Sequence, residues 1–162
     1  MTLHNISPVF DGNSKILILG SFPSVKSREE CFFYGHPQNR FWKVISKVFD
    51  MPEPQSIPEK RKLILSNSLA LWDVIGSCEI VGSSDSSIKN AVPNDVMKII
   101  KQTSVKRIIL NGKTAEKYYN RYLKKKIPIE AVTLPSTSPA NAAWSLDRLL
   151  AEWGKALTID FL

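Results

Sequence analysis

The segment Tyr34–Trp42 (Tyr-Gly-His-Pro-Gln-Asn-Arg-Phe-Trp) places an aromatic ring, an imidazole and an amide next to an amphipathic stretch that is typical of a helix. Tyr34 offers a face on which a flat ring can stack, and Asn39 offers a donor and an acceptor for the edge of that ring. His36 could donate to a leaving base or to a phosphate. Together these groups suit a pocket that holds a nucleobase.

Each of these residues also has a simpler structural explanation. From its residue type alone, Asn39 is better explained as the N-cap of a helix over residues 39–49. His36 precedes Pro37 and could be only a turn residue, and Tyr34 could be only a core or surface aromatic. The position of the segment in the fold therefore has to decide between these explanations.

Four nearly continuous runs of Ile, Val and Leu are typical of strands that are buried on both faces of a parallel sheet: 15–20, 69–75, 107–111 and 131–135. Five amphipathic stretches predict helices over residues 39–49, 58–66, 94–103, 114–124 and 141–157. The alternation predicts an α/β fold, a three-layer α/β/α sandwich around a central, mostly parallel four-stranded sheet. We expect a single domain over residues 1–162.

Polar segments follow three of the predicted strands, at residues 20–24, 111–114 and 134–141. In open parallel sheets, ligands bind outside the carboxyl ends of the strands, so we expect these segments to form one site. The second segment contains the Gly-Lys-Thr of a phosphate-binding loop, but Arg107 stands where that loop needs a further glycine. A nucleoside triphosphatase is therefore disfavoured, although free amides at this helix start could hold a DNA phosphate.

The composition narrows the class of protein and the kind of partner. Hydrophobic residues make up 43% of the chain, and the net charge of +7 favours a polyanionic partner such as nucleic acid. Two cysteines and two histidines do not supply the ligand set of a structural zinc or iron–sulfur site, so we expect no metal and no cofactor. Because the sequence lacks a signal-peptide pattern and a membrane-spanning apolar run, we expect a cytoplasmic protein.

Taken in order, the motifs resemble those of the uracil-DNA glycosylase superfamily over about residues 15–157. Gly20–Ser24 and Tyr34–Ile45 resemble the first motif region of the mismatch-specific uracil/thymine glycosylases. Leu110–Ala115 resembles their Gly-Lys segment, and Leu134–Pro139 corresponds to the loop that wedges into the base stack. Phe22 occupies the position of their active-site Asn, so the pattern is more similar to the hypoxanthine-DNA glycosylase branch.

The resemblance to this branch implies a monofunctional glycosylase that turns a deaminated base out of double-stranded DNA and hydrolyses its N-glycosidic bond. It implies that Asn39 is catalytic, either by orienting the attacking water or by stabilising charge on the leaving base. His36 could assist the departure of the base. We expect the protein to act as a monomer, associated with the nucleoid through DNA.

Base binding and DNA binding are expected from residues around the same motifs. We expect the base to contact the following side chains: Ser21, Phe22, Tyr34 and Asn111. We expect the DNA strands to contact a second set: Ser24, Arg40, Lys113, Ser136, Ser138, Pro139 and Asn141. Within this set Pro139 could act as the wedge, because the loop offers only small groups besides its proline.

Three alternatives stay open on the sequence alone. The same fold could act on another base, namely uracil, thymine or xanthine opposite guanine. The protein could also be a non-enzymatic nucleic-acid-binding module, which would show salt-dependent binding without base release. A small-molecule α/β enzyme such as an esterase is disfavoured, because the chain has no Gly-x-Ser-x-Gly elbow.

Overall fold

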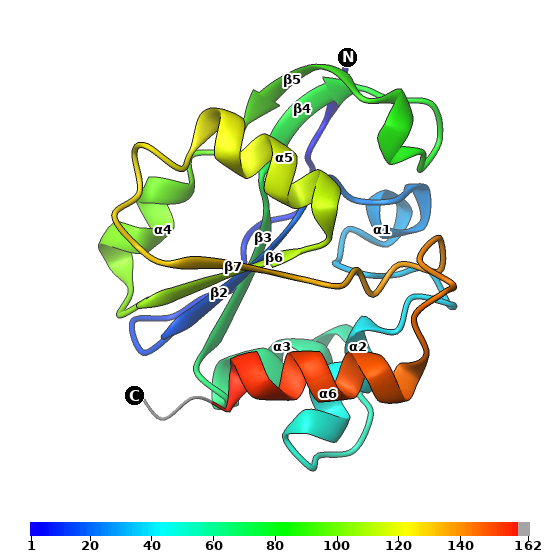
Figure 1. The fold of residues 1–162 in the computed structure, drawn as a ribbon, viewed down its shortest axis with the longest axis vertical. Coiled ribbons are helices and arrows are strands. Elements are labelled where there is room, and N and C mark those ends of the chain that lie inside the picture. The colour runs from blue at the N-terminus through cyan, green and yellow to red at the C-terminus, as the bar shows by residue number, and fades with distance from the viewer. Residues whose placement is uncertain (159–162) are drawn as a thin grey trace.

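The central sheet of the computed structural model, which describes residues 1–158, has four parallel strands. They are β2 (Ile16–Gly20), β3 (Leu69–Asp73), β6 (Arg107–Asn111) and β7 (Ala131–Leu134). The strands lie in the order β3-β2-β6-β7, so the apolar β2 is internal and every one of its residues is buried. This arrangement confirms the predicted parallel sheet (Figure 1).

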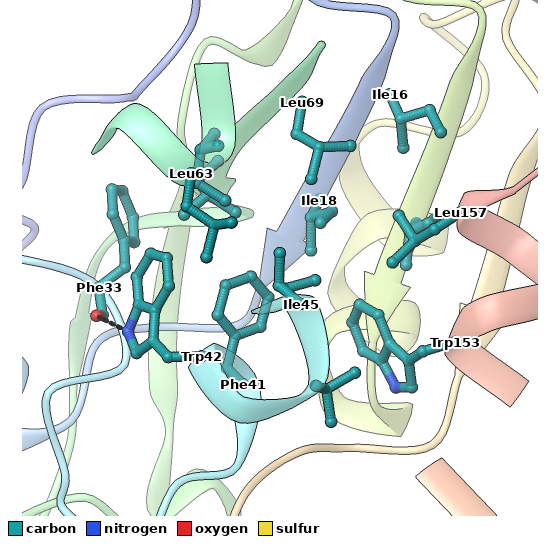
Figure 2. Close-up of a cluster of buried hydrophobic side chains, with 14 of the residues drawn as sticks. Ile16, Ile18, Phe33, Phe41, Trp42, Ile45, Leu63, Leu69, Trp153 and Leu157 are labelled. Atoms are coloured by element: carbon teal, nitrogen blue, oxygen red, sulfur yellow. Dashed lines mark hydrogen bonds between the residues drawn. The ribbon is translucent and has the colours of Figure 1, made fainter. Parts of the chain in front are cut away.

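Helices cover both faces of this sheet because side chains alternate along its strands. One layer consists of α2 (Phe41–Val48), α3 (Ile57–Ser66) and α6 (Leu146–Leu157), and the other of α4 (Val96–Gln102) and α5 (Lys113–Tyr122). Ile18 of β2 packs with Phe41 and Trp153 of the first layer, as Figure 2 shows, whereas Leu17 packs in the second core. The predicted three-layer sandwich is thus confirmed. Within residues 1–158, no helix combines the length and the apolar content needed to span a membrane.

A small antiparallel sheet, which the sequence did not predict, lies beside the central one. It consists of β1 (Thr2–Leu3), β4 (Ile75–Glu79) and β5 (Lys89–Pro93). The predicted strand 69–75 is wrong at its end, because β3 stops at Asp73 and the chain turns into β4. Asn94 stabilises this turn by donating to the carbonyl oxygens of Asp73 (2.9 Å) and Ile75 (3.2 Å).

The loop between β4 and β5 packs against the segment that follows β2. The loop contains a short helical turn, η1 (Asp85–Ser87), and the segment contains α1 (Val25–Glu30). The Val25 N–H donates to Ser83 Oγ at 2.9 Å, and Arg28 donates to the Gly82 carbonyl at 2.7 Å. The small sheet therefore carries residues 82–87 to the carboxyl end of β2, and Figure 1 shows η1 close to α1.

The predicted helix 141–157 is wrong at its start. Helix α6 begins at Leu146, where the Ser145 hydroxyl accepts from the Arg148 N–H at 3.2 Å. The preceding loop is fixed from outside, because the Arg40 guanidinium donates to the carbonyl oxygens of Asn141 (3.1 Å) and Trp144. A helix that began at 141 would turn these carbonyls toward its own amides, so the bonds to Arg40 favour the loop.

Candidate active site

A cavity of about 390 Å³ opens at the carboxyl ends of β2, β3 and β6, where the sequence predicted a ligand site. Its size falls in the range of about 300–1,000 Å³ that is typical of small-molecule sites. The wall comes from loops that are far apart in the sequence, at residues 20–24, 33–39, 83–86 and 136–140. Asp73 and Asn111 complete it from the strand ends.

Most of the residues expected at the site line this cavity. They are Ser21, Phe22, Ser24, Tyr34, His36, Asn39, Asn111, Ser136, Ser138 and Pro139. Three expected DNA contacts lie outside its lining: Arg40, Lys113 and Asn141. Lys113 is exposed in the first turn of α5, and the other two belong to the hydrogen bonds that shape the loop before α6.

Tyr34 adopts a left-handed backbone conformation (φ 53°) that turns its side chain into the site. Its ring stacks on Phe41, with 4.0 Å between the ring centroids and 20° between the planes. Burial, together with the nearby carboxylate of Asp73, raises the pKa of the Tyr34 hydroxyl, which therefore stays protonated at neutral pH. Phe22 lines the cavity from the loop after β2, with the Arg28 guanidinium 5.6 Å from its ring centroid.

Asn111 connects three parts of the site. Its amide nitrogen donates to the Tyr34 hydroxyl (3.2 Å) and to Thr137 Oγ1 (3.1 Å). Its amide oxygen accepts from the Thr137 N–H at 3.1 Å. The Asn111 amide thus reaches the cavity with both polar atoms already bonded, and it fixes the Tyr34 ring and the loop after β7 to the end of β6.

We expect Asn111→Ala to lower the free energy of unfolding by about 1–3 kcal/mol, because it leaves a buried amide of Thr137 without its acceptor. Urea denaturation would measure this loss. Tyr34→Phe is the matched control, since it removes one of the three bonds and keeps the ring. Equal stability of Asn111→Ala and the unsubstituted protein would contradict a fixing role for Asn111.

Asn39 and His36 both present hydrogen-bond donors at the cavity. The predicted helix 39–49 is wrong at its start, because α2 begins at Phe41 and its N-cap is Arg40 rather than Asn39. Asn39 lies one residue before the N-cap, and its Oδ1 accepts from the Phe41 N–H at 2.9 Å. Because a backbone N–H can only donate, this bond fixes the orientation of the amide and leaves Nδ2 without a partner among the described residues. His36 Nδ1 accepts from the Gln38 N–H (3.1 Å), so the neutral ring carries its proton on Nε2.

Asp73 is a buried carboxylate in the cavity that the sequence analysis missed. It ends β3, and its Oδ2 accepts from His4 Nε2 at 2.8 Å, while His4 Nδ1 accepts from the Ile6 N–H at 3.3 Å. A Cβ at Gly20 would lie 2.5 Å from Asp73 Oδ1 and 3.1 Å from the Tyr34 hydroxyl, so Gly20 leaves room for both groups. Asp73 Oδ1 has no hydrogen-bond partner in the described part of the chain.

Asp85 is the second carboxylate that the sequence analysis missed. It comes from the η1 turn, is exposed, and lines the cavity. Ser21 Oγ donates to Asp85 Oδ2 at 3.1 Å. Although the residue as a whole is exposed, its carboxylate lies against the hydroxyls of Ser21 and Thr114. The resulting loss of water around the carboxylate raises its pKa, the two hydroxyls lower it, and the charge of Asp73 adds to the increase.

Arg40 acts inside the protein through its two bonds to the loop at residues 138–145. We expect Arg40→Ala to accelerate amide hydrogen exchange in that loop, since charge-assisted bonds of this kind contribute about 1.5–3 kcal/mol each. Exchange measured by mass spectrometry would test this, with the exposed Lys43→Ala on α2 as the control. Unchanged protection of residues 138–145 in Arg40→Ala would contradict the fixing role.

The chain is similar to several known proteins. Residues 7–158 match the family model described as "Uracil DNA glycosylase superfamily". The chain is 34% identical over 147 residues to a "Hypoxanthine DNA glycosylase" of Methanosarcina acetivorans. The aligned region covers 90% of this chain and 91% of that protein. A protein of the same name from Methanosarcina barkeri is 32% identical over 160 residues, covering 96% and 98% of the two chains.

A solved structure shares the whole fold. It is the solution NMR structure of a candidate uracil DNA glycosylase from Methanosarcina acetivorans, 31% identical to this chain. The superposition has a TM-score of 0.82 and covers 96% of this chain and 97% of the other.

In residues 1–158 no group of three or more His, Cys, Asp or Glu side chains is arranged to hold a metal ion.

Proposed function

The chain belongs to the uracil DNA glycosylase superfamily, and on that premise we propose that it is a monofunctional DNA glycosylase that excises hypoxanthine, the product of adenine deamination. The observation that carries the proposal is the cavity at the carboxyl ends of the strands, which combines a stacked tyrosine, two donor side chains and a buried carboxylate. Such a cavity can hold a base that has been turned out of the duplex. Hydrolysis of the N-glycosidic bond then begins base-excision repair.

The base occupies the buried floor of the cavity. Tyr34 and Phe22 supply the aromatic faces, and Asn111 holds Tyr34 in place. Asp73 Oδ1 accepts from the ring N1–H of hypoxanthine. Adenine has an acceptor at N1, so it would leave the buried carboxylate facing a lone pair, at a cost of about 1–3 kcal/mol. Uracil and xanthine also carry a ring N–H. Asp73 therefore favours deaminated bases as a class and does not distinguish hypoxanthine from the other two.

The chemistry takes place nearer the mouth of the cavity, where the sugar is still joined to the backbone. Cleavage passes through an oxocarbenium-like sugar while negative charge builds on the leaving base. The unpartnered Nδ2 of Asn39 and the Nε2–H of His36 donate toward that charge. Of the two roles expected for Asn39, stabilisation of the leaving base is the one that a free donor supports best.

Binding to DNA rests on the basic surface and on the loop before α6. The net charge of +7 attracts the duplex. The side chains near the DNA strands are those of Ser24, Lys113, Ser136 and Ser138. Pro139 lies at the cavity and serves as the wedge. Arg40 and Asn141 contribute by shaping this loop. We expect the protein to act as a monomer on DNA in the cytoplasm, without a metal ion.

The test is base release from duplexes that carry one deoxyinosine, deoxyuridine or deoxyxanthosine, in buffer with EDTA. We expect free hypoxanthine and an abasic site, with the DNA strand left intact. Release of uracil alone would keep the reaction and overturn the substrate. No release from any duplex, with tight salt-sensitive binding, would leave a nucleic-acid-binding module as the function.

A further inference from the structure

The proposed hydrolysis needs a group that accepts a proton from the attacking water. Asn39 and His36 do not supply it, because the polar atoms that they leave free at the cavity are donors. Among the residues that line the cavity, all within the described part of the chain, carboxylates come from Asp73 and Asp85. One of these two is therefore the candidate for the proton acceptor.

The depths of the two carboxylates separate their roles. Asp73 is 4% exposed and lies among Gly20, Tyr34 and His4 at the floor. Asp85 is exposed. It lines the cavity together with the neighbouring serines of its loop, at positions 83, 84 and 86. A flipped base enters the floor, whereas its sugar stays near the mouth because the phosphodiester backbone holds it there. Asp85, the more exposed of the two residues, is thus the one whose carboxylate lies at the level of the reacting C1′ atom and of solvent water.

The Asp85 carboxylate is also held in place from several elements. Ser21, the first residue after β2, donates to its Oδ2 at 3.1 Å. Its loop is tied to α1 through the Val25 N–H on Ser83 and the Arg28 guanidinium on the Gly82 carbonyl. A carboxylate fixed in this way can orient a water molecule without reorganising during the reaction.

We propose that Asp85 is the general base of the reaction, and this inference rests on the proposed glycosylase function. Asp85 accepts a proton from water while the water oxygen forms a bond to C1′. The bond from C1′ to the base nitrogen breaks, and its electron pair leaves with the base. The proton then passes to the departed base, which gives neutral hypoxanthine and a C1′ hydroxyl. Ser21 is a positioning residue for Asp85.

Asp85→Asn tests the assignment, because an amide of the same shape can hold water but cannot take its proton. With enzyme in excess over a deoxyinosine duplex, we expect a single-turnover rate about 10²–10⁴-fold below that of the unsubstituted protein. Binding to a duplex with a tetrahydrofuran abasic analogue should be retained. Asp95→Asn, an exposed change at the start of α4 and outside the cavity, should leave the rate unchanged.

The pH profile separates proton transfer from a structural effect. The rate should fall as the pH drops through the pKa of Asp85, which burial raises above its usual range, because the protonated acid cannot act as a base. Asp85→Asn should lose this acid limb, and Ser21→Ala should shift it. The titratable and charged groups that face Asp85 or its loop are Asp73, Cys78, Tyr118, Arg28 and His36.

The result that overturns the assignment differs from the one that overturns the function. Suppose that the unsubstituted protein releases hypoxanthine and that Asp85→Asn does so within about threefold of its rate. Asp85 is then not the general base, because a threefold loss is well below the effect of removing one. An acid limb that persists in Asp85→Asn has the same meaning. If the unsubstituted protein releases no base, the proposed glycosylase function itself fails.

Discussion

Asn39→Ala is expected to lower the single-turnover rate of hypoxanthine release by about 10²–10³-fold, the usual loss when one donor to a developing negative charge is removed. The reason is that Asn39 Nδ2 is free at the cavity while its Oδ1 is bound by the start of α2. The rate would be measured with enzyme in excess over a deoxyinosine duplex. Affinity for a duplex with an abasic analogue should change little.

The Asn39 side chain also accepts from the first amide of α2, so two further variants must separate this structural bond from catalysis. Asn39→Asp and Asn39→Ser both keep an oxygen that can accept from the Phe41 N–H, and both remove the amide donor. We expect both to unfold at nearly the same urea concentration as the unsubstituted protein and to release hypoxanthine slowly. Full activity in Asn39→Ser would mean that Asn39 only orders the start of α2 and takes no part in catalysis.

The central sheet could be predicted because its strands are short, mainly apolar runs, and β2, β3 and β6 are largely buried on both faces. The edge strand β7 is more exposed, but its Ala-Val-Thr-Leu run still suits a strand. The small sheet could not, because β4 (Ile-Gly-Ser-Cys-Glu) and β5 (Lys-Asn-Ala-Val-Pro) carry no such run. The start of α6 was misplaced for a different reason. It depends on bonds from Arg40, about a hundred residues away in the sequence, that no local pattern reveals.

The residues of the candidate site also differ in whether the local sequence reveals them. Tyr34, His36 and Asn39 could be found because they lie within one segment whose residue types suit a base. Asp73 and Asp85 were missed because each lies in a segment that looked merely structural: Asp73 lies within the predicted strand 69–75, and Asp85 lies in a serine-rich loop. An aspartate that interrupts an otherwise apolar run was the available signal for Asp73, because it could mark the end of a strand, where parallel sheets bind ligands. Asp85 offered no comparable signal, since its contact with Ser21 spans 64 positions.

Asp73→Asn is expected to change which base the protein accepts. In the variant, His4 Nε2–H still donates to the side-chain oxygen, and this bond turns the new amide nitrogen toward the cavity. A donor then faces the base where Asp73 Oδ1 stood. The N1–H of hypoxanthine meets this donor unfavourably, whereas N1 of adenine can accept from it. We expect the rate on deoxyinosine to fall by about 10- to 100-fold, the equivalent of one mispaired buried group.

The measurement that decides this is the ratio of the rates on deoxyinosine and deoxyadenosine in otherwise identical duplexes, not either rate alone. Asp85→Asn is the matched control, because it removes the other carboxylate of the same cavity. If Asp73 reads the base and Asp85 acts on water, Asp73→Asn lowers the ratio, and Asp85→Asn slows release without changing the preference. An unchanged ratio in Asp73→Asn, in a protein that still folds and binds DNA, would mean that the buried carboxylate stabilises the floor of the cavity through His4 and does not read the base.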